Sequence, residues 1–262
     1  MSISAAVLEA RAVSKRFGGL VAVNAVDLDV GEGEIVGLIG PNGAGKTTFF
    51  NCLTGMETPT SGQIRYRGRR LIGSPDRITA AGLARTFQNI RLFPNMTVLE
   101  NVLVGRHCRT REGILSAIGR GPAYKREEAE SRARSCELLE LVGLRRAADD
   151  LARNLNYGDQ RRLEIARALA TDPGLLLLDE PTAGMNAAET RSTGDLVRRI
   201  RDQGLAVVVI EHDMRFIFGL CDRVAVLVQG QKLTEGSPDE VQSDPRVIAA
   251  YLGTPAGGQP PP

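Results

Sequence analysis

The sequence lacks an uninterrupted apolar run of the roughly 20 residues that a bilayer-spanning helix needs. The N-terminal residues reach Arg11 before a signal peptide's apolar core could form. The cysteines have no paired spacing, so neither a disulfide framework nor a zinc site is indicated. The cysteines are Cys52, Cys108, Cys136 and Cys221. We therefore expect a soluble protein of a reducing, cytoplasmic compartment, which serves a membrane only through a partner.

A strong excess of one charge is missing as well. Lys and Arg number 33 against 31 Asp and Glu, which gives a formal net charge of +2. This balance indicates no polyanionic partner, and without a cluster of basic and aromatic residues it argues against nucleic acid. The 262 residues, 42% of them hydrophobic, are enough for a substantial core in one large domain or two small ones.

What the sequence does contain is a glycine-rich loop between an apolar strand at 34–39 and a helix expected at about 45–54. The loop reads GPNGAGKT, Gly40–Thr47, and fits the phosphate-loop pattern G-x-x-x-x-G-K-[ST]. Its glycines let the backbone close around phosphates, Lys46 supplies a positive charge, and the last residue offers a hydroxyl to Mg²⁺. The flanking strand and helix favour this interpretation over an incidental glycine turn.

Two carboxylates follow a second apolar run, Leu175–Leu178. A run with no polar side is typical of a parallel strand covered on both faces. We expect Asp179 to hold Mg²⁺ through water. Glu180 points to the other side and is placed to orient or deprotonate an attacking water; the alternative is a capping or surface glutamate. Because His212 ends another buried strand, where α/β proteins bind ligands, we favour a γ-phosphate contact for it over a structural role.

A second helix start capable of binding an anion lies in LNYGDQRRLEIARALA, Leu155–Ala170. The stretch is expected to open with a turn built on Asn156 and Gly158 and to continue as a helix. Unpaired N–H groups and the helix dipole converge at such a start. The chain thus carries two helix starts that could bind phosphate, although one would suffice to hold a nucleotide.

The remaining segments predict an α/β part and a helical insertion. We expect a half-buried strand at 26–30, a hairpin within 61–71 and a short strand at 83–87. Strand signals vanish between about Phe93 and Ala152, where 124–144 is helical. Basic residues crowd the first part of this stretch, as a solvated face or as a docking surface. They are Arg106, Arg109, Arg111, Arg120, Lys125 and Arg126.

The α/β alternation returns after the insertion. Buried strands are expected at 205–210 and 224–228, and helices at 186–203 and from a capping box at 237 to about 252. The tail, 253–262, is expected to be disordered.

Five motifs occur in the order and approximate spacing of the ATP-binding-cassette ATPases, which the chain resembles over almost its whole length. They are Gly40–Thr47, Gln88, Leu155–Gln160, Leu175–Glu180 and His212. The resemblance implies one α/β domain at 1–252. It would have a P-loop NTPase core, RecA-like with a mainly parallel sheet, at about 1–92 and 160–252. An antiparallel β subdomain and a helical subdomain inserted at about 93–159 would complete it.

The resemblance also implies roles for single residues. Catalytic roles are implied for Lys46, Gln88, Glu180 and His212, and Mg²⁺ contacts for Thr47, Gln88 and Asp179. The aromatic ring expected to stack on adenine is that of Phe17. The other residues expected to contact ATP are Asn42, Gly43, Ala44, Gly45, Lys46, Thr47 and Thr48.

The second helix start matches the family signature, which binds the γ-phosphate of ATP held by a second subunit. The signature residues are Asn156, Tyr157, Gly158 and Asp159. The usual signature is LSGGQ; here asparagine replaces serine and can still donate to phosphate, tyrosine replaces a glycine, and aspartate replaces glutamine. That carboxylate is unhelpful near a phosphate unless it faces away or pairs with Arg161 or Arg162. Residues 183–186 match the loop that crosses the seam between two cassettes.

Several phrases, among them RTFQNIRLFPNMTVLENVLVG and VVVIEHDM, are similar to the ATP-binding subunits of bacterial branched-chain amino-acid importers. The resemblance implies an ATPase that uses ATP and Mg²⁺ and lies peripherally on the cytoplasmic face of the inner membrane. The expected partners are integral membrane permease subunits, a second ABC ATPase subunit in a homo- or heterodimer and, indirectly, a periplasmic solute-binding protein. No nucleic-acid partner is expected.

Three alternatives stay open. The first is the ATPase of a urea or amide importer. The second is a soluble cassette ATPase acting on ribosomes or DNA, which usually carries two cassettes or an inserted coiled coil. The third is a plain P-loop kinase or GTPase, which would leave the second helix start and His212 unexplained.

Overall fold

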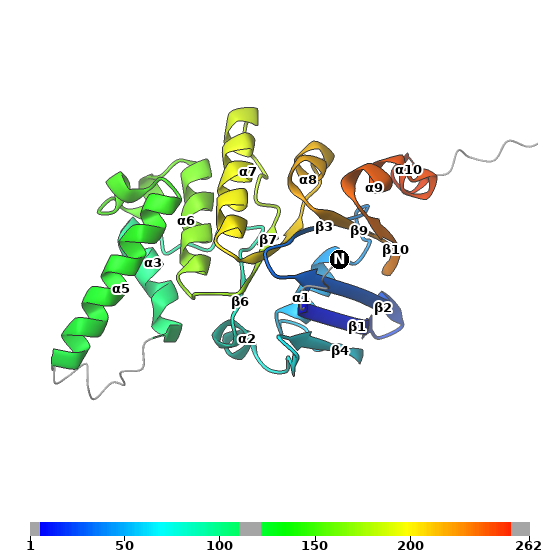
Figure 1. The fold of residues 1–262 in the computed structure, drawn as a ribbon, viewed down its shortest axis with the longest axis horizontal. Helices are drawn as coiled ribbons and strands as arrows, with labels where there is room; N and C mark the ends of the chain where they lie inside the picture. The colour runs from blue at the N-terminus through cyan, green and yellow to red at the C-terminus, as the bar shows by residue number, and fades with distance from the viewer. Residues whose placement is uncertain (1–5, 110–121, 253–262) are drawn as a thin grey trace, which may run out of the picture.

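The computed structural model describes residues 6–109 and 122–252 and contains two sheets with helices around them (Figure 1). The larger sheet is built from β3 (Ile35–Ile39), β6 (Leu83–Arg85), β7 (Leu175–Asp179), β8 (Ala206–Ile210), β9 (Arg223–Val228) and β10 (Gln231–Gly236). The strand order is β10-β9-β3-β8-β7-β6. All neighbours are parallel except β10, which pairs antiparallel with β9 at one edge.

The smaller sheet is antiparallel and has the order β2-β1-β4-β5. Its strands are β1 (Ala6–Phe17), β2 (Leu20–Gly31), β4 (Ser61–Tyr66) and β5 (Arg69–Arg70). The half-buried strand expected at 26–30 is confirmed, because Val26, Leu28 and Val30 are buried while Asp27 is exposed. The hairpin expected within 61–71 is confirmed as β4 and β5.

One helix, α1 (Lys46–Leu53), packs in the core that the two sheets share. Its Phe49 and Phe50 are fully buried there. Strand β7 separates this core from a second one on the opposite face of the larger sheet: Leu175 and Leu177 belong to the first core, and the alternate leucines 176 and 178 belong to the second. Burial on both faces explains why the strand has no polar side.

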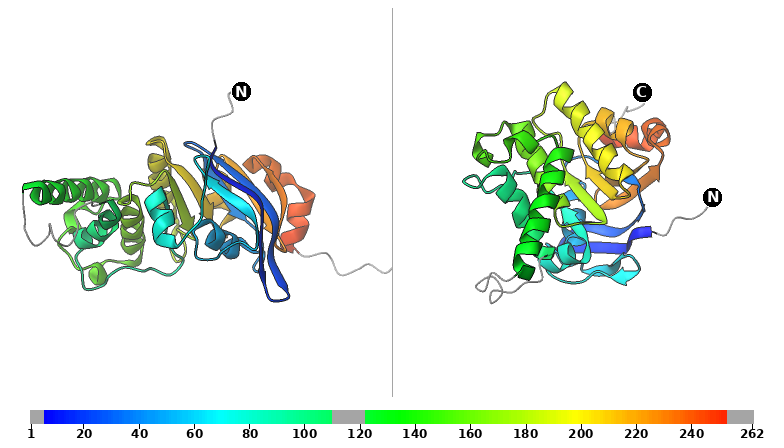
Figure 2. Two further views of the ribbon diagram at one scale, coloured as in Figure 1. Left: turned by 90° about the horizontal axis from the view of Figure 1, so that it is seen from below. Right: turned by 60° about the vertical axis from the view of Figure 1, so that its left-hand side comes forward.

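Most of the other helices cover the second core and extend it to one side, as Figures 1 and 2 show. Helix α2 (Pro75–Ala81) is the exception, because its buried Ile78 belongs to the first core. The longer helices are α3 (Val98–Arg106), α5 (Pro122–Leu141), α6 (Tyr157–Leu169) and α7 (Ala187–Asp202); the short ones are α2 (Pro75–Ala81), α8 (Met214–Leu220), α9 (Pro238–Ser243), α10 (Pro245–Leu252) and the 3₁₀ turns η1 (His107–Arg109), η2 (Arg145–Ala147) and η3 (Ala152–Asn154). None of the described helices is long and apolar enough to span a bilayer.

The helical insertion is confirmed within the described residues, where its only β pairing is an isolated bridge between Thr97 and Leu151. Helix α6 packs on α3 and α5 and runs across the subdomain boundary expected at 159–160. The domain division therefore stays a prediction. The expected disordered tail at 253–262 lies outside the described residues, as do Arg111 and Arg120.

The larger sheet brings the predicted motifs to one edge. Strands β3, β8, β7 and β6 are neighbours and parallel, so their carboxyl ends lie side by side. The segments that leave these ends are the glycine-rich loop, residues 211–212, Glu180 and the stretch to Gln88. The carboxyl edge of a parallel sheet is where such folds bind ligands.

Candidate functional site

The glycine-rich loop joins β3 to α1 in the conformation that a phosphate loop needs. Gly45 caps α1 with φ 96°, and no side chain bonds the first N–H groups of this helix. A Cβ on Gly45 would lie 2.3 Å from the Ala22 carbonyl oxygen, so no larger residue fits. The free N–H groups of the first turn and the positive end of the helix dipole therefore favour an anion at this point.

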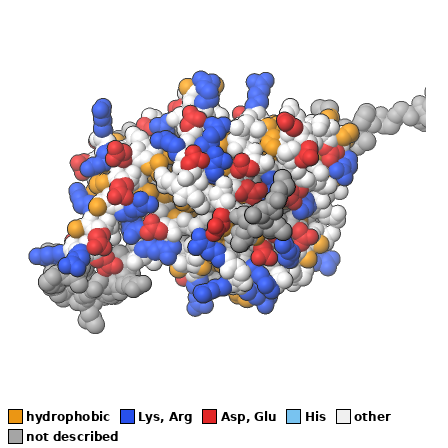
Figure 3. Space-filling model, in the orientation of Figure 1, with side chains coloured by type: hydrophobic (Ala, Val, Ile, Leu, Met, Phe, Trp, Pro, Cys, Tyr) orange, Lys and Arg blue, Asp and Glu red, His pale blue; other side chains and the backbone are white. Residues whose placement is uncertain are grey.

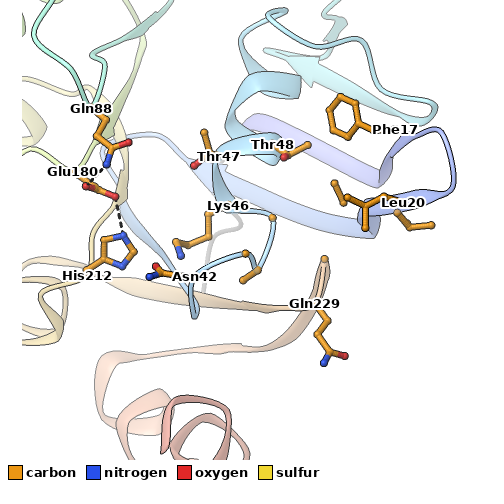
Figure 4. Close-up of a pocket in the computed structure, with 16 residues that line it drawn as sticks. Phe17, Leu20, Asn42, Lys46, Thr47, Thr48, Gln88, Glu180, His212 and Gln229 are labelled. Carbon is orange, nitrogen blue, oxygen red and sulfur yellow. Dashed lines mark hydrogen bonds and ion pairs between the residues drawn. The ribbon is translucent and has the colours of Figure 1, made fainter. Parts of the chain in front are cut away.

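This loop borders a cavity of about 780 Å³, which is shown in Figure 4. The predicted residues brought together around it are Phe17, Asn42, Gly43, Ala44, Gly45, Lys46, Thr47, Thr48, Gln88, Glu180 and His212. Sequence reasoning missed the rest of the lining, which is Leu20, Val21, Ala22, Gln229 and Gly230. Lys15 Nζ lies over the Phe17 ring, 4.9 Å from its centroid. Phe17 is nevertheless 45% exposed, which leaves part of its surface available for stacking.

Lys46 is the buried cation of the site. Its side chain donates from Nζ to the carbonyl oxygens of Gly40 at 2.6 Å and Pro41 at 3.1 Å. Burial lowers the pKa of the Lys46 ammonium, while the carboxylates of Glu180 and Asp179 act in the opposite direction. A cation held only by neutral carbonyl groups is ready to exchange them for the oxygens of an anionic ligand.

Glu180 is held from two sides across the cavity (Figure 4). Gln88 Nε2 donates to its Oε2 at 2.9 Å, and His212 Nε2 lies 2.8 Å from its Oε1. Because an ionised carboxylate only accepts, the His212 proton in this pair resides on Nε2. Glu180 also has φ 48°, a left-handed conformation that costs a non-glycine residue about 1–3 kcal/mol. Strained residues cluster at functional sites, and Glu180 lines the cavity.

Asp179 lies beneath the cavity rather than on its wall. Its Oδ2 accepts from Arg85 Nη2 at 2.6 Å, and both side chains are only 6% exposed. Arg85 also donates from Nη1 to Asn51 Oδ1 at 2.7 Å and stacks over the Phe50 and Phe87 rings. Sequence reasoning missed Arg85; its position two residues before the phenylalanine of the RTFQ phrase was the available signal.

Glu211 was also missed, although it fixes the turn that follows Glu180. It is 4% exposed, accepts from the Thr182 backbone N–H at 2.8 Å through Oε1, and accepts from the His212 backbone N–H at 2.9 Å through Oε2. This carboxylate thus connects the segment carrying Glu180 to the segment carrying His212.

The second helix start lies apart from this cavity, and its expected turn is corrected by the structure. Asn156 is the N-cap of α6, so the helix begins at Tyr157 and Gly158 lies inside its first turn. The Asn156 side chain is engaged: Oδ1 accepts from the Asp159 backbone N–H at 2.9 Å, and Nδ2 donates to the Asp159 carboxylate at 2.8 Å. Of the alternatives left open for that carboxylate, the structure shows pairing with Arg162, at 3.6 Å.

The basic residues of the helical stretch have different surroundings. Arg106 pairs with Asp172, and Arg109 donates from Nε to the Thr171 carbonyl oxygen at 2.6 Å, so both fasten their segment to the end of α6. Lys125 is exposed on α5. On the face shown in Figure 3, acidic and basic side chains are interspersed.

The cavity fits a nucleoside triphosphate with a divalent cation. Free helix N–H groups and Lys46 suit the phosphates, and the exposed Phe17 ring suits a base. Within the described residues no cluster of three or more His, Cys, Asp or Glu side chains could hold a metal alone. The Thr47 hydroxyl and the Gln88 amide are donors on the cavity wall, and the Asp179 carboxylate beneath it would act through water. Such a sparse set suits Mg²⁺, which is usually bound through one or two carboxylates together with substrate phosphates.

The family described as "ABC transporter" matches residues 23–183, and the one described as "Branched-chain amino acid ATP-binding cassette transporter" matches residues 231–257. The high-affinity branched-chain amino acid transport ATP-binding protein LivG of Salmonella typhimurium is 48% identical, over 96% of this chain and 99% of that protein. The protein BraF of Pseudomonas aeruginosa, described in the same words, is 45% identical over the same shares.

Solved structures agree with this relationship. An ATP-binding cassette of an ABC transporter in its ADP conformation matches with a TM-score of 0.83 and 30% identity, over 95% of this chain and 99% of that one. A dimeric ATP-binding cassette in a post-hydrolysis state, bound to ADP and Pi, matches with a TM-score of 0.73 and 27% identity, over 88% and 98%. These likenesses confirm the predicted P-loop fold.

Proposed function

The chain belongs to the ABC transporter family of ATP-binding cassettes, and we propose that it binds and hydrolyses ATP to power an importer of branched-chain amino acids. The observation that carries the proposal is the position of Glu180. Its carboxylate faces the glycine-rich loop across the cavity and is held at both oxygens, by Gln88 and His212. A carboxylate fixed in this way can orient water and accept its proton.

The residues around the cavity have separate roles in phosphoryl transfer. Lys46 and the N–H groups at the start of α1 neutralise the phosphates, and the Phe17 ring stacks on the base. Once His212 leaves Glu180, its Nε2–H donates a hydrogen bond to a γ-phosphate oxygen, and Glu180 is then free to hold the attacking water. Thr47, Gln88 and Asp179 would hold Mg²⁺, which withdraws charge from the phosphates when bound. Fixed charges of this kind supply most of the catalysis in phosphoryl transfer.

The signature residues complete the site of a second subunit. The start of α6 offers N–H groups and a helix dipole to the γ-phosphate of ATP held by a partner cassette. Neither cassette alone then has all the donors that the reaction needs, so hydrolysis follows closure of the dimer. Closure would move the permease subunits that we propose as membrane partners, on the cytoplasmic face of the inner membrane.

The replacement Glu180→Gln tests the catalytic part of this proposal. The amide keeps the shape of the side chain but cannot accept a proton, so MgATP should bind with unchanged affinity while phosphate release falls by about 10²–10⁴-fold. The exposed Glu140 on α5 gives the control Glu140→Gln, which should hydrolyse ATP normally. Normal turnover by Glu180→Gln would refute the assignment.

The transported solute rests on the relatives, which are described as branched-chain amino acid transport proteins. Uptake by vesicles containing the complete transporter should depend on this chain and be competed by leucine but not by urea. Competition by urea alone would favour the urea-importer alternative. Copurification with ribosomes and never with membranes would favour the soluble cassette ATPase.

A further inference from the structure

Arg161, on the first turns of α6, lies in the middle of a buried network. The residue is 3% exposed. Its Nη1 donates to the Phe87 carbonyl oxygen at 2.6 Å, and its Nη2 donates to the Gln88 carbonyl oxygen and to the Tyr157 hydroxyl, the latter at 2.9 Å. One guanidinium thus joins the backbone that carries Gln88 to a side chain of the signature turn.

The backbone beyond Gln88 is fastened to the same helix. The Arg91 N–H donates to Glu164 Oε1 at 3.0 Å, and Arg167 donates from Nη1 to the Arg91 carbonyl oxygen. Glu164 is 2% exposed and lies 3.3 Å from Arg161. Because both ends of the segment 87–91 are bonded to α6, a displacement of this helix carries Gln88 with it.

Tyr157 also contacts the segment that follows Glu180. It packs so closely on Gly184 that a Cβ there would lie 3.2 Å from the tyrosine Cε1, and Gly184 has φ 76°. Gly184 belongs to the short segment between Glu180 and α7. The tyrosine ring therefore touches the segment that follows Glu180. Its hydroxyl accepts from Arg161, which also binds the backbone of Gln88.

We propose that Tyr157 and Arg161 are positioning residues that couple the signature turn to Gln88 and hence to Glu180. The inference rests on the proposed function, because the signature turn is taken to receive the ATP of a second subunit. When a phosphate settles on the start of α6, the first turn and Tyr157 move as one unit. Arg161 passes that movement to the Gln88 carbonyl, and the Gln88 amide in turn alters its bond to Glu180.

Two mild substitutions in the full-length chain test the coupling. Tyr157→Phe removes only the hydroxyl, and Arg161→Lys keeps the charge beside Glu164 but cannot bridge two carbonyls and a phenol. Each should lower kcat by about tenfold, the size expected for hydrogen bonds to a charged group, with KM for ATP and the affinity for MgATP within about twofold of the original chain. The double variant should be no slower than Arg161→Lys alone, since both act through one contact.

A distant arginine provides the matched control. Arg223 bonds the Glu34 carboxylate and the Asp29 carbonyl oxygen, far along the sheet from the cavity, so Arg223→Lys should lower Tm and leave kcat unchanged. Unchanged kcat in Tyr157→Phe, or multiplied losses in the double variant, would overturn the coupling. Failure of the proposed function is distinct: it would appear as absent ATP hydrolysis in the original chain or as normal hydrolysis by Glu180→Gln.

Discussion

At the scale of single residues, Arg85 and Asp179 form a buried ion pair beneath the cavity. A buried aspartate without a partner would be costly, because removal of a charge from water is repaid only by close pairing. Arg85 supplies that partner at 2.6 Å and is itself braced by Asn51 and two aromatic rings. The pair fixes the Asp179 side chain beneath the cavity.

Replacement of this arginine should therefore destabilise the fold. Arg85→Met leaves the Asp179 carboxylate buried without its partner, which we expect to lower the free energy of unfolding by about 3–5 kcal/mol. Urea denaturation followed by circular dichroism would measure the loss. Arg69 is exposed on β5, so Arg69→Met is the control. A loss below about 1 kcal/mol in Arg85→Met would mean that Asp179 finds water or another partner.

At the scale of elements, five helices begin at a residue whose side chain caps them, namely α3, α6, α7, α8 and α9. Thr97 starts α3: its hydroxyl accepts from the Glu100 N–H at 3.1 Å, and the Glu100 carboxylate accepts from the Thr97 N–H at 2.7 Å. Two otherwise unpaired backbone donors are satisfied by this reciprocal arrangement. The capping box expected from the sequence at Ser237 is confirmed in the same form at the start of α9.

Loss of the Thr97 hydroxyl should weaken α3 by the usual amount for a cap. Thr97→Ala is expected to cost about 1 kcal/mol, and Thr97→Ser, which keeps the hydroxyl, only a few tenths. Thermal unfolding of both variants beside the original chain gives the comparison. Equal melting temperatures for Ala and Ser would show that Glu100 and water satisfy the helix start without the side chain.

The elements that the sequence predicted best are those with an unambiguous burial pattern. Strand β7 was expected because its first four residues are all leucine, and both of its faces are covered. Strand β10 was not predicted, since QKLTEG mixes polar and apolar residues without alternation and pairs only with β9 at the sheet edge. Its formation depends on the neighbouring strand, which a local pattern does not contain.

At the scale of the whole molecule, one part of the site could be predicted from the sequence and another part could not. The glycine-rich loop, Glu180 and His212 could be brought together from the sequence, because each follows a buried strand of one parallel sheet. The residues that hold these groups in place could not be predicted in this way. Arg85 meets a residue 94 positions away and Arg161 meets carbonyl groups 73 and 74 positions away, and no local pattern predicts which distant polar groups will meet.

At this scale the proposed closure of a dimer can be tested through the signature turn. In a Glu180→Gln background, which should keep ATP unhydrolysed, MgATP is expected to shift the chain from monomer to dimer in sedimentation velocity. Gly158→Asp should raise the ATP concentration needed by about tenfold or more, because a carboxylate at the helix start repels phosphate. Its Cβ would also lie 3.2 Å from the Glu189 carboxylate.

The control for this prediction is Gly219→Asp, which adds the same charge on α8 where a Cβ would meet nothing within 4 Å. It should dimerise like the background. If the chain dimerises only after a second ATPase subunit is added, the working dimer joins two different chains, and Gly158→Asp should weaken that association by the same factor. Equal association with and without the Gly158 replacement would mean that the second helix start faces no phosphate, and hydrolysis would then need no partner cassette.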